Sequence, residues 1–186
     1  FTIEMNAQVD KGSDAILFAM TEQHTDYEDL LAFAYSNADD ALVGFANNKL
    51  FKSKPLRKAG LNINDVMTHV GMVYESENQN LWFIGGNDTI SVASTEEFAP
   101  SENLLKPSDK ITGTLVFGAP MQGYLSDVRI WHRALNSYEI ANKFGKKLSA
   151  GEKDLMAWWP MDEAFGNTVV DKANGADLQL HNVSWE

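Results

Sequence analysis

The sequence predicts an all-β protein: an antiparallel two-sheet jelly-roll sandwich, similar in class to concanavalin A, with one short α-helix near residues 137–147. Three observations predict this class: strict alternation of apolar and polar residues at the start, nine further short apolar runs between turn-forming residues, and a composition of 44% hydrophobic and 11% aromatic residues. A chain of 186 residues with this composition buries one sizeable core. We therefore expect a single domain over residues 1–186, excised from a larger protein.

The first strand is the clearest element. Phe1, Ile3, Met5, Ala7 and Val9 alternate with polar residues, which places the apolar side chains on one face and predicts a solvent-facing opposite face. The remaining runs predict strands over residues 15–20, 30–35, 41–46, 66–74, 81–84, 111–117, 128–131, 155–161 and 178–185.

Two details refine the sheets. Several runs are apolar at both parities, residues 15–20 for example, which predicts that a second layer or a loop covers their outer face. Between Leu125 and Val128 the alternation slips by one residue, which predicts a β-bulge.

The predicted helix has a clear N-terminal signal. Asn136 is a candidate N-cap, Glu139 completes a capping box three residues later, and Tyr138, Ile140 and Phe144 begin an apolar stripe. We expect this helix to pack across one end of the sandwich. The longest irregular stretch covers residues 87–110, and loops of that length are usually functional or mobile.

Charge and composition exclude several classes of function. With 26 acidic and 15 basic residues the net charge is -11, which argues against nucleic acid as a partner. No apolar run approaches the roughly 20 residues that span a bilayer, so direct membrane insertion is not expected. Cysteine is absent, and the four histidines are too dispersed for a metal-ligand spacing.

A long segment carries a resemblance to a known family. Residues 123–140, GYLSDVRIWHRALNSYEI, resemble the late strand and helix of bacterial laminin-G-like, concanavalin A-like jelly-roll domains. Further similar segments are FTIEM at residues 1–5, THVGMVY at 68–74 with LWFIGG at 81–86, and LMAWWPMDE at 155–163. The chain departs from the family in two places: Asn6 stands where a Trp is usual, and residues 155–186 resemble what normally opens such a domain. They either close this sheet or begin a second domain.

The resemblance implies a function without deciding it, because the fold hosts lectins, spacers and hydrolases. Hydrolytic members of the family carry Glu, an apolar residue, Asp, two residues and Glu, and this chain has no such run. We therefore predict no enzymatic activity. We expect a glycan-binding module of a secreted or cell-surface bacterial protein, whose partners are a polysaccharide and neighbouring domains, with any signal or anchor outside this chain. A protein-interaction or spacer domain is the main alternative, and a divergent hydrolase is a third.

Sugar binding requires exposed aromatic faces and a few fixed polar groups. By strand parity Phe83, Trp131 and Trp158 point away from the core, and with Glu4 and Asn6 they are predicted to line the outward face of one sheet. The helix or the long loop would cover Trp131 and Trp158 in the alternative interpretation. His24 and Tyr27, in a polar loop, are alternative stacking residues.

Calcium is the ion that the composition favours. Residues 171–177 offer Asp171, Asn174 and Asp177 within seven positions, and carboxylate and amide oxygens are the ligands of hard cations. The predicted metal ligands are Asp162, Asp171 and Asn174. The spacing does not match an EF-hand loop, and Asn174-Gly175 is a turn signal in its own right.

Overall fold

The structure is a computed structural model, and it describes residues 1–20, 31–46, 49–75, 77, 80–86, 115–118, 121–149 and 151–186. In chain order the elements are β1 (Thr2–Val9), β2 (Ala15–Met20), β3 (Leu31–Ser36), β4 (Ala41–Ala46), β5 (Lys49–Lys52), a short 3-10 helix η2 (Arg57–Ala59), β6 (Thr68–Glu75), β7 (Asn80–Gly85), β8 (Leu115–Phe117), β9 (Gly123–Trp131), α1 (Ser137–Lys143), β10 (Leu155–Trp159), β11 (Thr168–Val169) and β12 (Leu178–Gln179).

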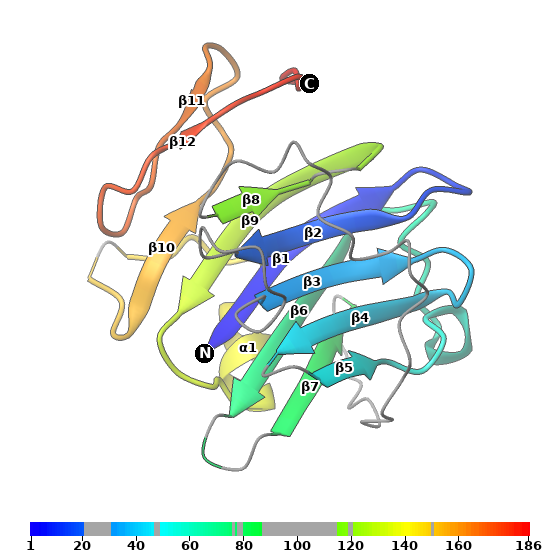
Figure 1. Cartoon of the computed structure of the whole chain (residues 1–186). Helices are drawn as coiled ribbons and strands as arrows, with labels where there is room; N and C mark the ends of the chain where they lie inside the picture. The colour runs from blue at the N-terminus through cyan, green and yellow to red at the C-terminus, as the bar shows by residue number, and fades with distance from the viewer. Residues whose placement is uncertain are drawn as a thin grey trace.

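Two five-stranded antiparallel sheets pack face to face, which confirms the predicted fold class (Figure 1). One sheet, which we call the β1 sheet, has the strand order β10-β9-β1-β6-β7. The other, which we call the β3 sheet, has the order β5-β4-β3-β2-β8. Strands β11 and β12 form a separate hairpin near the C-terminus. Because β10 pairs with β9, the segment that resembles an opening strand forms the edge of the β1 sheet.

The core lies between the two sheets, where the predicted alternation holds. Ile3, Met5, Ala7 and Val9 of β1 are buried against side chains of both sheets. The opposite face of β1 differs from the prediction. Thr2 and Glu4 are fully buried and Asn6 is half-buried, because other parts of the chain cover the first half of that face.

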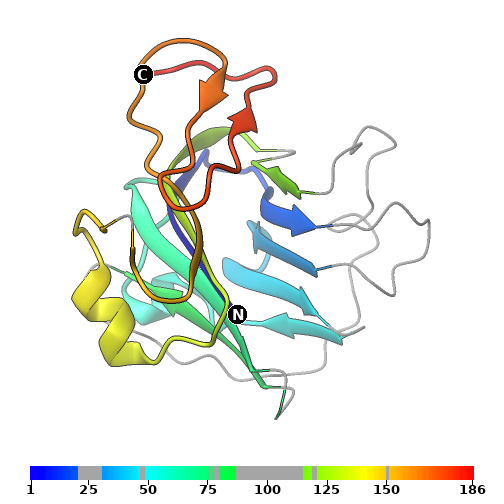
Figure 2. The same cartoon turned by 90° about the vertical axis from the view of Figure 1, so that its left-hand side faces the viewer.

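Helix α1 causes much of this burial. It lies against the outer face of the β1 sheet, as Figure 2 shows, and not across one end of the sandwich as we predicted. Its capping box is confirmed: the Asn136 side chain accepts from the Glu139 backbone N–H, and the Glu139 carboxylate accepts from the Asn136 N–H. Ile140 faces the sheet, whereas Tyr138 is exposed, so the predicted apolar stripe is narrower than expected.

The predicted bulge is also present. The register of β9 against β1 shifts between the Glu4–Arg129 and Asn6–Ser126 pairs, which leaves an additional residue on β9. Asp127, in this interval, has a φ of 51°. A bulge redirects the side chains beside it, and here the redirected side chain is the Asp127 carboxylate.

Several strand boundaries differ from the predicted ranges. Strands β5 and β11 were not predicted, and the last predicted strand is reduced to Leu178–Gln179. The predicted loops over residues 21–29 and 87–110, including His24 and Tyr27, lie outside the described residues. Among the described helices, none has the length and apolar character required to cross a bilayer.

Candidate functional site

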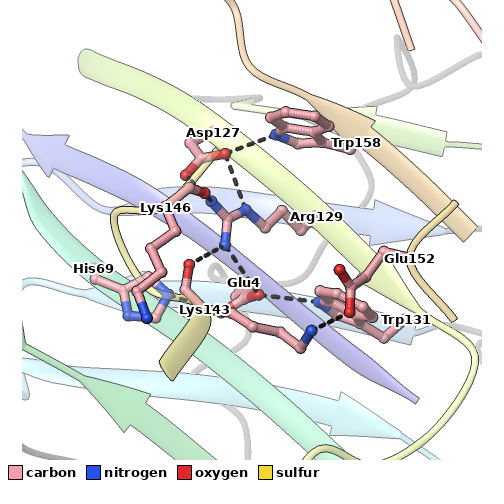
Figure 3. Close-up of polar contacts among 9 residues, drawn as sticks. All are labelled: Glu4, His69, Asp127, Arg129, Trp131, Lys143, Lys146, Glu152 and Trp158. Carbon is pink, nitrogen blue, oxygen red and sulfur yellow. Dashed lines mark hydrogen bonds and ion pairs between the residues drawn. The ribbon is translucent and has the colours of Figure 1, made fainter. Parts of the chain in front are cut away.

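Three of the predicted ligand residues are brought together on the outer face of the β1 sheet. Glu4 lies on β1, Trp131 on the neighbouring β9, and Trp158 on β10 beyond it. Figure 3 shows them with His69, Asp127 and Arg129, and we call these six residues the α1 polar network.

Glu4 is the centre of this network. Its Oε1 accepts a hydrogen bond from Trp131 Nε1 at 2.9 Å, and its Oε2 lies 3.0 Å from His69 Nε2. Arg129 Nη1 is 3.8 Å from Oε1. Burial alone raises the pKa of Glu4, but the hydrogen bond to His69, the charges of His69 and Arg129, and the Trp131 N–H together lower it below the ordinary value.

Arg129 connects this carboxylate to the end of the helix. Its guanidinium is bidentate on Asp127, with Nε 3.0 Å from Oδ1 and Nη2 2.6 Å from Oδ2. It also donates to the backbone carbonyls of Lys143 and Lys146, each at 2.9 Å. Carbonyls at a helix C-terminus lack partners within the helix, and a cation is favoured there. Trp158 Nε1 completes the arrangement by donating to Asp127 Oδ1 at 2.8 Å.

Helix α1 and the turn after it cover the network on the side away from the core. Leu135, Ile140 and Leu148 form an apolar cluster with Trp131 and Trp158. The Phe144 ring lies 4.4 Å from the His69 ring, centroid to centroid. Lys143 Nζ lies 5.1 Å from the centre of the Trp131 ring and is ion-paired with Glu152.

This cover corrects the predicted exposure. Trp131 is 0% and Trp158 5% exposed, and Glu4 is buried as well. The two indoles lie on the outer face, as alternation predicts, but neither presents a ring to solvent. Their N–H groups are already bonded to carboxylates. The network therefore attaches α1 to the sheet.

Phe83 was assigned to the wrong face. It is 2% exposed and belongs to the core between the sheets, with its ring stacked on Phe33 at 6.1 Å between centroids. Its neighbours Trp82 and Ile84 point outward, into the cluster below α1. Both faces of β7 are apolar because both are covered, so hydrophobicity alone did not distinguish inner from outer.

The predicted metal ligands have other partners in the structure. Asp171 is buried, and its carboxylate accepts backbone N–H groups from Trp158, Ala173, Asn174 and Ala176 at 2.8–3.1 Å. Burial raises its pKa, and these four hydrogen bonds outweigh that effect and lower it.

The other two metal candidates do not join Asp171 in a ligand cluster. The Asn174 amide donates to the carbonyls of Leu155 and Met156, at 3.1 and 2.7 Å, and Asp162 is exposed. Within the described ranges, no group of three acids or histidines is placed to hold a metal ion. Calcium binding stays a prediction from the sequence, and the carboxylate of Asp171 serves to fold its own loop onto β10.

Asn6 follows Glu4 on the outer face of β1. It is half-buried and pairs in register with Ser126 of β9, while the next outward residue, Gln8, pairs with Tyr124. Tyr124 is 42% exposed. The pKa of its hydroxyl is raised, chiefly by a hydrogen bond to the Glu186 carboxylate, so the C-terminal segment reaches this end of the sheet.

Sequence reasoning did not single out Arg129 or Asp127, and it overlooked the aromatic residues near the C-terminus. Phe165 is 81% exposed, and Trp185 is half-buried. The available signal was the presence of aromatic residues in a turn-rich polar segment after β10. Strand parity drew attention instead to Phe83, Trp131 and Trp158, which the fold covers.

The comparisons with known proteins bear on the fold. No protein-family model matches the chain, and no curated protein matches it. Among solved structures it is similar to a proposed carbohydrate-binding protein from Bacteroides ovatus ATCC 8483, with a TM-score of 0.60 and 15% sequence identity. The match covers 100% of this chain and 54% of the other, so this chain spans about half the length of that protein. Similarity at this identity shows a shared fold.

Proposed function

We propose that this chain is a non-catalytic carbohydrate-binding module of the laminin-G-like kind, part of a larger secreted or surface-anchored bacterial protein. The observation that carries the proposal is the similarity in fold, over the full length of the chain, to a protein proposed to bind carbohydrate. Fold alone does not determine function. Here it agrees with the function that the resemblance of residues 123–140 to laminin-G-like domains implies.

The contacts of three acidic residues, Glu4, Asp127 and Asp171, agree with binding without hydrolysis. A retaining glycosidase on such a fold requires two carboxylates about 5–5.5 Å apart that face one groove. Glu4 and Asp127 are instead bonded to Trp131, Arg129 and Trp158 below the helix. Asp171 is held by backbone N–H groups. These carboxylates stabilise the fold and are not free to act as acid or nucleophile.

The test is binding of the chain to a panel of plant, host and microbial polysaccharides, by calorimetry and by intrinsic tryptophan fluorescence, with calcium and with a chelator. Saturable binding without release of reducing sugar supports the proposal. Absence of binding across the panel refutes it and favours the alternative, a protein-interaction or spacer module. Binding that requires calcium would add a cation site to the module. Release of reducing sugar would support the third alternative, a divergent hydrolase.

A further inference from the structure

Three aromatic side chains lie in the C-terminal segment or close to its last residue, Glu186. They are Tyr124 at the start of β9, Phe165 in the loop before β11, and Trp185 after β12. We call them the C-terminal rim. In Figure 1 the chain after β12 runs from the hairpin back over this end of the sandwich. We propose that this rim is the saccharide-stacking surface of the protein, an inference that rests on the carbohydrate-binding function proposed above.

A hydrogen bond links Trp185 to the loop that carries Phe165. Trp185 Nε1 donates to the carbonyl of Gly166, the residue after Phe165, at 2.8 Å. This bond holds the indole against the loop that carries Phe165. The Glu186 carboxylate, next in the chain after Trp185, lies close enough to the Tyr124 hydroxyl to raise its pKa. Trp185 also packs against the core between the sheets, so part of its ring is anchored and the remainder is open.

The loop that carries Phe165 is held in a defined conformation. Met161, Ala164 and Gly166 all have positive φ, at 61°, 61° and 82°. For Met161 and Ala164 this conformation costs free energy, and such strain persists where surrounding contacts determine it. The contacts are present: Glu163 Oε1 accepts from the Val170 N–H at 3.0 Å. A phenyl ring with 81% exposure is thus presented to solvent by an ordered loop.

The chemistry of the rim suits a sugar chain. Pyranose rings have apolar C–H faces that stack on aromatic rings, and hydroxyls around their edges that require polar partners. Polar groups lie near Tyr124, since Gln8 is its register partner and Asp10 lies close enough to affect its pKa. Rings on an open rim contact consecutive sugars along a chain, whereas a closed pocket would select a chain end.

Charge narrows the substrate class further. The rim carries Glu186 and has Asp10 nearby, in a chain of net charge -11. Like charges disfavour association. We therefore infer that the ligand is a neutral polysaccharide, and that uronate-rich or sulfated chains bind poorly.

A protein partner fits the rim less well. An aromatic side chain buries about 150–250 Å² when fully covered, so three partly exposed rings offer only a few hundred Å² of apolar contact. A stable protein interface buries about 800 Å² on each partner. A sugar chain requires a much smaller contact surface.

The test compares wild type with Phe165→Ala and Tyr124→Ala on neutral β-glucan, xylan and mannan, with polygalacturonate as the anionic probe. Tyr138→Ala is the matched control, because Tyr138 is an exposed aromatic residue on α1, away from the rim. We expect each rim variant to weaken binding of the neutral probe by about fivefold or more, as loss of a stacked ring implies. Melting temperatures should match wild type, and Tyr138→Ala should bind normally.

The outcomes separate the site from the function. If wild type binds a neutral chain and the rim variants bind it equally well, the rim proposal is refuted while carbohydrate binding stands. Preference for polygalacturonate would refute the charge argument. If wild type binds none of the probes, the proposed function and the rim proposal both fail, and capture of a protein partner by the wild-type chain, reduced by Phe165→Ala, would assign the rim to protein docking instead.

Discussion

The buried carboxylate of Glu4 allows the role of the α1 polar network to be tested quantitatively. We consider Glu4→Leu, which introduces an apolar side chain of similar size and removes both carboxylate oxygens. Trp131 Nε1 and His69 Nε2 then lose their partner, and Arg129 loses its second carboxylate. Glu4→Gln is the matched control, because an amide keeps an acceptor toward Trp131 and a group that hydrogen-bonds His69.

The expected magnitude follows from the number of groups left without partners. A buried donor or acceptor without a partner costs about 1–3 kcal/mol, and two such groups cost about 2–6 kcal/mol. Removal of one member of a buried ion pair costs about 3–5 kcal/mol in other proteins, in agreement with this range. We expect Glu4→Leu to lower the free energy of unfolding by about 3–5 kcal/mol, and Glu4→Gln to lower it by about 1–2 kcal/mol.

Urea denaturation monitored by tryptophan fluorescence measures both values. With an m-value of about 1–3 kcal/mol per molar urea, the Glu4→Leu midpoint falls by about 1 M or more. Hydrogen exchange of the amides in α1 should rise in Glu4→Leu, since the network attaches this helix to the sheet. Equal losses in the two variants, or a loss below about 1 kcal/mol in Glu4→Leu, would show that the hydrogen bonds are not what stabilises this layer.

Three other predictions follow from the packing and the electrostatics. Because the folded pKa values of Glu4 and Asp171 lie below their ordinary values of 4.5 and 3.8, their contribution is present above those values and is lost as the pH falls through the folded pKa. Acid titration followed by circular dichroism should show falling stability below about pH 4.5, and a stability that is flat from pH 6 to pH 3 would contradict this. Gly123 has a φ of 137°, and a Cβ there would lie 2.0 Å from the carbonyl oxygen of Gln8, so Gly123→Ala should destabilise by about 2–4 kcal/mol. Gly151→Ala, where a Cβ has nothing within 4 Å, is the control, and equal thermal melting of the two variants would refute the prediction. Phe83→Ala should cost about 3–5 kcal/mol as a core truncation and leave polysaccharide affinity unchanged in protein that remains folded; weaker binding in calorimetry would return Phe83 to the ligand site.

The local features of the fold were predictable because neighbouring residues determine them. The alternation from Ile3 to Val9 identified the inner face of β1, since successive side chains of a strand point to opposite faces. The Asn136–Glu139 capping box located the start of α1, because its two hydrogen bonds lie within four residues. The bulge near Asp127 was visible as a break in the apolar–polar alternation of β9.

The candidate site was harder to predict, because exposure depends on what packs above a strand. Parity placed Trp131 and Trp158 on the outer face, yet α1 and the turn after it bury both rings. Sequence spacing contains no information about where a helix joined by a short loop will dock. For the same reason, two of the aromatic residues that remain exposed, Tyr124 and Phe165, were not singled out.

The sequence by itself thus determined the class of fold, the position of the helix along the chain and the absence of a hydrolase carboxylate run. Only the tertiary structure decided which polar and aromatic groups are available. It placed Glu4 and Arg129 under a helix, Asp171 inside its own loop, and Trp185 at an open rim. The physical reason is that periodicity reports the direction of a side chain from its own backbone, whereas burial depends on segments that are distant in sequence and meet only in the folded protein.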